Sequence, residues 1–115
     1  MIKKLHQLWG GDQPIHSDYK RCSETMQKLN PDWEYVLWDQ QSAFKSTEHV
    51  IHKYNIPYDT YPIDIERWDV LRVLLVYVHG GVCCDLDMEC LQNINNIEMK
   101  HTCGFMTEEN IGTTD

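Results

Sequence analysis

Short apolar segments alternate with longer amphipathic segments along most of the chain. Residues 4–9, 33–38 and 82–86 are short, rich in apolar, aromatic or β-branched residues, and each is followed by Gly or Asp. Such runs are typical of strands buried in a sheet. We therefore predict strands over these three ranges and a fourth over residues 101–106.

Three helices are expected between these strands. Ser17 or Asp18 can cap the first and Ser42 the second, because a side-chain oxygen accepts a hydrogen bond from the free N–H groups of the first turn. The third has apolar residues at helical spacing, and Gly80 follows it as a helix-ending residue. The predicted helices span residues 17–29, 42–54 and 63–79.

The order strand, helix, strand, helix, helix, strand predicts an α/β fold with a mainly parallel central sheet. A chain of 115 residues is expected to form a single domain, residues 1–115. In parallel sheets, ligands bind outside the carboxyl ends of the strands. Trp9, Asp39 and Asp87 lie at predicted strand ends and are therefore expected to converge there.

The net charge of −8 restricts the class of ligand. No stretch of the chain is strongly basic, which argues against a nucleic-acid-binding protein, because such proteins neutralise phosphates with Lys and Arg. An acidic chain is compatible with a bound divalent cation. The longest apolar run, residues 70–78, is interrupted by Arg72 and is too short to cross a bilayer, so we expect no membrane span.

The cysteine count bears on the cellular compartment. The chain has five cysteines, an odd number that favours reduced thiols over a disulfide framework. The first residues, Met-Ile-Lys-Lys-Leu-His, lack the apolar stretch of a secretory signal. We therefore expect a soluble, cytoplasmic protein.

The clearest chemical signal is the pair Asp85 and Asp87, which follows a double glycine and a short predicted strand. On an extended backbone, residues two apart point to the same side. Neighbouring carboxylates repel unless a cation lies between them, and Mn²⁺ or Mg²⁺ binds one or two carboxylates together with phosphate oxygens. The alternative is a chance Asp-x-Asp sequence in a solvated turn.

Two further groups are candidates for ligand binding. Asp69 and Arg72 share one face of the longest predicted helix, and they form either an intrahelical salt bridge or a pair that binds ligand hydroxyls or phosphate. His6, Gln7 and Trp9 gather at the end of the first predicted strand. There Trp9 either offers a flat ring to a base or sugar or packs as a core or rim aromatic.

A thiolate zinc site is the competing metal hypothesis. Adjacent cysteines on a strand point to opposite faces, so two of the candidate ligands do not readily share one ion, and the chain has no Cys-x-x-Cys pair. Zinc is therefore disfavoured. The candidate ligands are Cys83, Cys84, Cys90, His101 and Cys103.

Several segments occur in the order and spacing of a known family. They are Leu5-His6-Gln7-Leu8-Trp9-Gly10-Gly11, Asn30-Pro31-Asp32-Trp33-Glu34-Tyr35 with Leu37-Trp38-Asp39, Arg67-x-Asp69-x-x-Arg72, and Gly80-Gly81 before Asp85-Leu86-Asp87 and Glu89-Cys90-Leu91. Over nearly its whole length the chain resembles the DXD-containing sugar-binding region of the mannosyltransferase-like and capsular polysaccharide glycosyltransferases.

The resemblance implies a Rossmann-like GT-A fold and a metal-dependent hexosyltransferase. The implied donor is a UDP- or GDP-sugar bound with Mn²⁺ or Mg²⁺, and the implied stereochemistry is retention of the anomeric configuration. Trp9 would stack on the nucleotide base, and Leu8 would offer backbone contacts. A nucleotide-sugar-binding module without efficient transfer is the alternative function, and a structural or interaction domain is a third.

The family's remaining site residues carry over to four positions. Asp69 and Arg72 would hold the donor sugar. Asp85 would contact ribose or sugar hydroxyls and reach the metal through water, and Asp87 would ligate the metal directly.

The chain also departs from the family's pattern. Trp68 stands where a small residue is usual, and Cys83 stands where an aromatic is common. Relatives continue well past the point that matches Asp115, so we expect the acceptor-side region to be missing or minimal, and a glycan, lipid or protein remains open as the acceptor. An uncovered sheet edge near residues 101–106 predicts self-association into a homo-oligomer.

Overall fold

The computed structural model describes residues 2–96 of the chain. Within this range, three parallel strands form one sheet in the order β2-β1-β3. β1 (Lys4–Leu8) is the central strand, with β2 (Glu34–Trp38) on one side and β3 (Val82–Cys83) on the other. The predicted strand at residues 101–106, and with it the edge expected to promote self-association, lies outside the described residues.

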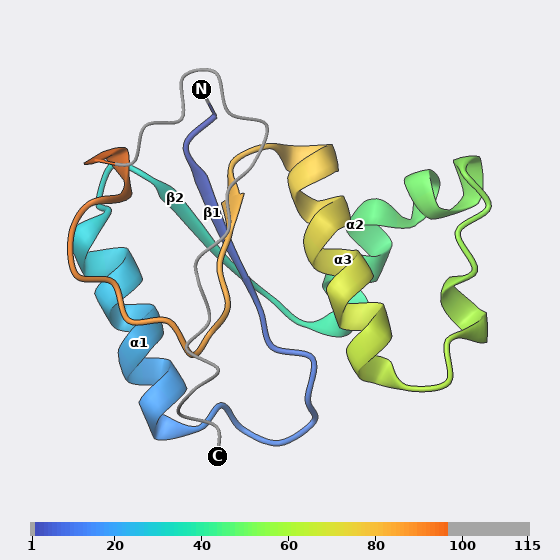
Figure 1. Ribbon diagram of the computed structural model, residues 1–115, viewed down its shortest axis with the longest axis horizontal. Coiled ribbons are helices and arrows are strands. Elements are labelled where there is room, and N and C mark those ends of the chain that lie inside the picture. Colours follow the sequence, from blue (N-terminus) through green and yellow to red (C-terminus); the bar gives the residue numbers. More distant parts are fainter. Residues whose placement is uncertain (1, 97–115) are drawn as a thin grey trace, which may run out of the picture.

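Helices cover both faces of the sheet (Figure 1). α1 (Ser17–Leu29) lies on one side, and α2 (Gln40–Lys53) and α3 (Asp64–His79) lie on the other. Short 3-10 helices, η1 (Tyr58–Thr60) and η2 (Ile94–Asn96), follow α2 and β3 along the chain. The predicted α/β class with a parallel central sheet is confirmed.

α1 spans the predicted residues, whereas α2 begins at Gln40 rather than at Ser42, and in both helices a residue other than the predicted one is the cap. His16, not Ser17 or Asp18, caps α1, and its Nδ1 accepts a hydrogen bond from the Asp18 N–H at 3.2 Å. The Asp39 carboxylate caps α2 by accepting from the Ser42 N–H at 2.7 Å, while the Ser42 hydroxyl accepts from the Asp39 N–H at 3.1 Å. This reciprocal pair is a capping box, so Ser42 lies inside the first turn of the helix.

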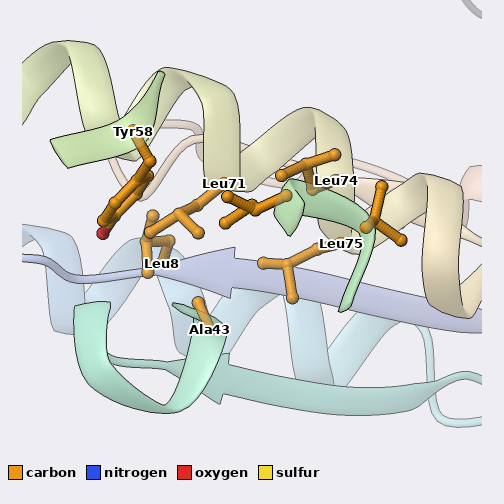
Figure 2. Packing of buried hydrophobic residues seen from close by; sticks show 8 residues of the cluster. Leu8, Ala43, Tyr58, Leu71, Leu74 and Leu75 are labelled. Carbon is orange, nitrogen blue, oxygen red and sulfur yellow. The ribbon is translucent and has the colours of Figure 1, made fainter. Parts of the chain in front are cut away.

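The core on one face of the sheet lies between β1, α2 and α3 (Figure 2). Leu71 and Leu75 of α3 are fully buried and pack in one cluster with Leu8 of β1 and Ala43 of α2. Tyr58 of η1 belongs to the same cluster. Full burial of a leucine side chain contributes about 1.5–3 kcal/mol, so this packing fixes α3 against the central strand.

A second core lies between α1 and the opposite face of the sheet. The chain beyond β3 returns to α1, where the Cys90 N–H donates to the Thr25 hydroxyl at 2.9 Å and the Ile94 N–H donates to the buried Asn30 side chain at 2.7 Å. These bonds tether the chain on the far side of the Asp-Leu-Asp segment. The buried members of this core are Leu5, Met26, Trp33, Val82, Cys90 and Ile94.

The double glycine determines where β3 begins. Gly80 ends α3 as predicted, and Gly80 and Gly81 have φ angles of 73° and 88°, which glycine adopts without strain. A Cβ atom at Gly81 would lie 2.1 Å from the Lys4 carbonyl oxygen of β1. The close approach of these two backbones therefore requires glycine. The predicted strand over residues 82–86 is too long, because β3 ends at Cys83 and the chain then turns.

We expect Gly81→Ala to lower the free energy of unfolding by more than ~2 kcal/mol, because it combines an unfavourable φ with a clash against the backbone of β1. Gly80→Ala is the matched control. Its Cβ would meet the Cδ1 atom of Ile2, the flexible end of an exposed side chain, so its cost should be smaller. Urea denaturation of both variants measures the difference, and equal costs would contradict this account of the strand junction.

Candidate functional site

A pocket of about 220 Å³ opens beyond the carboxyl ends of β1 and β3. The end of β1 contributes Leu8 to its lining, and the following loop contributes Trp9 and Gly10. α1 contributes Tyr19, and α3 contributes Trp68 and Arg72. The Asp85-Leu86-Asp87 segment completes the lining. The pocket thus gathers five of the six residues to which the family resemblance assigns a role, all except Asp69.

The two aspartates line the pocket through a turn of the backbone. The Cys84 N–H still donates to the His6 carbonyl at 2.9 Å, but the Met88 N–H then donates to the Asp85 carbonyl at 3.4 Å. Asp85 and Asp87 are exposed, while Leu86 between them is buried and anchors the turn. The prediction that an extended backbone aligns the two carboxylates is therefore wrong, although both still face the same pocket.

Arg72 joins the helix pair to this turn. Its Nη1 donates to the Asp69 carboxylate at 2.7 Å, and its Nε lies 3.8 Å from the Asp85 carboxylate. The intrahelical salt bridge is therefore present, and the same guanidinium also lines the pocket. Asp69 does not line the pocket, and it holds Arg72 from one side.

Aromatic side chains form the remaining walls. The Trp9 indole donates from Nε1 to the Gln13 carbonyl at 2.7 Å, and its ring lies 6.4 Å from the Tyr19 ring in an edge-to-face arrangement. Trp68 donates from Nε1 to the Gln40 side chain at 2.8 Å. A Cβ atom at Gly10 would lie 2.2 Å from the Trp68 indole, so glycine lets this large ring occupy the wall.

Tyr19, which lines the pocket, and Gln40, which holds Trp68 from outside it, were not predicted, because their contribution depends on how α1 and α2 pack. Two residues that the sequence did single out lie elsewhere. Asp39 caps α2 and does not line the pocket, although it follows β2 directly. Arg67 donates from Nε to the Tyr58 carbonyl at 3.1 Å and from Nη2 to the Tyr61 carbonyl at 2.6 Å, so it fixes the loop before α3.

His6 and Gln7 are buried on opposite sides of β1. His6 donates from Nε2 to the Gly80 carbonyl at 2.9 Å and accepts from the Trp38 indole at Nδ1, at 3.1 Å, which defines a neutral ring. Burial lowers the pKa of His6, and the neighbouring His79 lowers it further. Gln7 contacts the backbone of Asp85. Neither side chain lines the pocket.

The donor set at the pocket fits a hard divalent cation. Carboxylate oxygens are ligands that Mg²⁺ and Mn²⁺ prefer, and within residues 2–96 the Asp87 carboxylate makes no hydrogen bond or ion pair that would occupy it. No group of three or more His, Cys, Asp or Glu side chains in that range lies close enough to hold an ion. The remaining ligands would therefore be water and oxygens of a bound molecule.

The thiols of the zinc hypothesis have a different character. The cysteines that the structure describes are free, and burial raises the pKa of Cys83 to about 12 and that of Cys84 to about 11. Zinc binds the thiolate, so an ion would have to displace the proton of each thiol, and burial makes this more costly here. His101 and Cys103, the other partners considered, lie outside the described residues.

Comparison with known protein families matches residues 16–103 to the glycosyltransferase sugar-binding region containing the DXD motif. The chain belongs to this glycosyltransferase family. Within the matched residues, its one Asp-x-Asp sequence is Asp85-Leu86-Asp87, which lies at the pocket. The implied family, and the GT-A-like α/β architecture expected with it, are thereby confirmed.

The curated relatives of this DXD-family chain include mannosyltransferases. It is 33% identical over 93 residues to inositol phosphoceramide mannosyltransferase 3 of Schizosaccharomyces pombe, covering 81% of this chain and 26% of that protein. It is 32% identical over 97 residues to inositol phosphoceramide mannosyltransferase 2 of the same yeast, covering 83% and 27%. An uncharacterized glycosyltransferase of Acanthamoeba polyphaga mimivirus is 28% identical over 94 residues, covering 80% and 38%.

The chain therefore spans about a quarter to two fifths of the length of these relatives. No solved structure is significantly similar to it. Among the residues that the structure describes, no helix is both long and apolar enough to cross a membrane. The cytoplasmic location expected from the cysteine count and the first residues stays a prediction.

The buried His6 predicts a loss of stability in mild acid. Because the pKa of His6 in the folded protein lies below the ordinary 6.5, the unfolded chain takes up the proton first as the pH falls. The stabilising contribution is complete above pH 6.5 and is lost as the pH drops toward the folded-state value. His79 shifts in the same direction through burial. Urea denaturation between pH 7.5 and 5.5 should therefore show decreasing stability.

His52 provides the control for this measurement, since it lies on the exposed side of α2 beside Glu48. His52→Gln should leave the decrease in place. An NMR titration in which the His6 ring gains its proton above pH 6.5 would contradict the assignment of a neutral, buried ring.

Proposed function

We propose that the pocket binds a UDP- or GDP-sugar donor together with Mn²⁺ or Mg²⁺, and that this donor site serves a hexosyltransferase. The observation that carries the proposal is the convergence of two exposed carboxylates, one arginine and two tryptophans on one pocket. They come from three stretches of the chain, which supply Trp9, Trp68 with Arg72, and Asp85 with Asp87. Membership in a DXD-containing glycosyltransferase family supports the assignment.

Asp87 is proposed as the direct metal ligand, because within residues 2–96 its carboxylate has no other partner. Asp85 is proposed to reach the ion through water and to accept hydrogen bonds from ribose or sugar hydroxyls. A divalent cation bound there would offset the negative charge of the departing nucleoside diphosphate. The two carboxylates thus orient the donor at the open end of the sheet.

Arg72 is proposed to hold the donor sugar, with Asp69 orienting its guanidinium. An ion pair this exposed contributes only about 0–1 kcal/mol, and the Asp85 partner is 62% exposed. A ligand oxygen can therefore replace the Asp85 carboxylate beside Nε of Arg72 at little cost in free energy. The 2.7 Å bond to Asp69 meanwhile keeps the guanidinium of Arg72 oriented. Fixed positioning of this kind contributes to catalysis by reducing the entropy lost on reaching the transition state.

Trp9 is proposed to stack on the nucleotide base, and the backbone around Leu8 to contact the nucleotide. The bond from the Trp9 indole to Gln13 holds the ring at the pocket wall before any ligand arrives. Such preorganisation lowers the entropy cost of binding. Trp68 narrows the pocket from the side of α3 and is proposed to limit the size of the sugar.

The names of the relatives suggest a sugar. Two of them are inositol phosphoceramide mannosyltransferases, so we propose mannose as the first donor sugar to test, with retention of the anomeric configuration. Because the chain covers only about a quarter of these proteins, their lipid is only one candidate acceptor beside other lipids, glycans and proteins.

A donor-binding module without efficient transfer is the second candidate. The pocket supports it by its small volume, since about 220 Å³ is less than most small-molecule sites occupy, and by the exposure of Asp85. Water around the diphosphate weakens electrostatic stabilisation. Turnover of GDP-mannose, compared with UDP-glucose, separates the two candidates, since a binding module holds the donor without consuming it.

For the metal, we expect EDTA or Asp87→Asn to weaken GDP or UDP binding about tenfold or more in calorimetric titrations. The fold should survive, because one of two repelling carboxylates is neutralised. Glu89→Gln is the matched control. Glu89 is an exposed carboxylate just past the turn, and it forms an ion pair with Arg21. Equal nucleotide affinity with and without metal would reject the site.

For the sugar, we expect Arg72→Ala to weaken binding of the nucleotide-sugar about tenfold while changing the affinity for the bare nucleoside diphosphate far less. Arg21→Ala is the control, because it removes an exposed arginine and its ion pair outside the pocket. If Arg72→Ala lowers thermal stability but keeps the preference between the two ligands, the intrahelical salt bridge alone explains the pair.

A further inference from the structure

We infer that Gln7 and Tyr35 form a positioning pair that holds the Asp85-Leu86-Asp87 turn in its ligand-binding shape. Gln7 lies on the central strand with none of its surface exposed. Its Nε2 donates to the Asp85 carbonyl at 2.9 Å, and its Oε1 accepts from the Tyr35 hydroxyl at 2.7 Å. The inference rests on the proposed function, because it assigns a role to residues behind the donor pocket.

The two bonds connect β2 and β1 with the segment that follows β3. Tyr35 lies on β2, Gln7 on β1, and Asp85 just beyond the end of β3. The direction of the connection is fixed by chemistry, since a backbone carbonyl only accepts hydrogen bonds. The amide nitrogen of Gln7 must therefore face Asp85, its oxygen must face β2, and Tyr35 must donate. Burial raises the pKa of Tyr35, which keeps its hydroxyl protonated.

The Asp85 carbonyl is the acceptor for two hydrogen bonds that hold the turn. It accepts from the Met88 N–H at 3.4 Å, a long hydrogen bond, and from Gln7 at the shorter distance of 2.9 Å. The buried side-chain amide is therefore the stronger restraint on the backbone between the two carboxylates. Hydrogen bonds within a protein interior also strengthen each other when they are connected, as those of Tyr35 and Gln7 are.

An apolar residue would fill the position of Gln7 at less cost, because a buried amide is tolerated only when its polar atoms are paired. Leu5, two residues earlier on the same face of β1, is such an apolar residue and is equally buried. Neither Gln7 nor Tyr35 lines the pocket. Their effect on a ligand therefore passes through the backbone of Asp85, as expected of positioning residues.

The test compares Gln7→Met, which keeps the length of the side chain but lacks both bonds, with Tyr35→Phe, which removes only the outer donor. We expect Gln7→Met to weaken Mn²⁺-dependent GDP or UDP binding about threefold to tenfold, in line with the net contribution of one buried hydrogen bond. Tyr35→Phe should act in the same direction with a smaller effect. Binding in EDTA should stay as in the wild type.

Val50→Ala is the control for stability, because it opens a cavity in the core on the opposite face of the sheet. Hydrogen exchange at the Met88 amide adds a measurement that needs no ligand. Exchange should accelerate in Gln7→Met and should be unchanged by Val50→Ala under conditions where both variants are folded.

The outcomes distinguish the two proposals. If wild-type binding is metal-dependent but Gln7→Met changes neither this binding nor Met88 exchange, the positioning role is overturned and the donor site stands. If the wild type shows no metal-dependent nucleotide binding, the proposed function fails, and the positioning role fails with it even if the turn loosens.

Discussion

The burial of β1 between two parallel neighbours is the constraint on which the rest of the structure depends. Four of its five residues are buried, and leucines of α3 pack on one face while Met26 of α1 packs near the other. Because β1 and β3 are parallel, their carboxyl ends open at the same edge of the sheet. The loop with Trp9 and the turn with Asp85 and Asp87 therefore meet, although more than seventy residues separate them.

The charged side chains at this edge of the sheet interact with one another only weakly. Arg72 lies between the carboxylates of Asp69 and Asp85, and both partners are mostly exposed. Such ion pairs are weakened by water and salt. They therefore orient the charged side chains, yet a ligand can replace either partner. The buried bonds behind the site are better protected from solvent: Gln7 and His6 are nearly inaccessible, and each of their side-chain nitrogen and oxygen atoms makes a hydrogen bond. The site thus combines exposed ion pairs at the pocket, which a ligand can replace, with buried hydrogen bonds behind the pocket, which stay fixed.

The sequence predicted the α/β class, the three helices and the first two strands, because hydrophobic periodicity reflects burial, and burial decides these elements. It failed at the third strand, where residues 84–86 read as a continuation. The turn at Asp85 depends on a hydrogen bond from Gln7, a contact between segments far apart in the chain. The capping residues were predicted wrongly for a local reason. His16 directly precedes Ser17 and Asp18, which are more common capping residues than histidine. Asp39 lies three residues before Ser42, and Asp and Ser cap helices about equally well.

Five of the six residues to which the family resemblance assigns a role line one pocket, because strand ends and helix faces are readable from pattern and family resemblance. Tyr19 and Gln40 were not predicted, since their positions depend on helix packing that periodicity does not specify.

The most direct measurement of the central claim is a crystal structure with Mn²⁺ and GDP, with anomalous data for manganese. We predict a manganese peak at the Asp87 carboxylate, with the diphosphate beside Arg72. A manganese peak away from Asp87, with the nucleotide bound outside the pocket, would contradict the account.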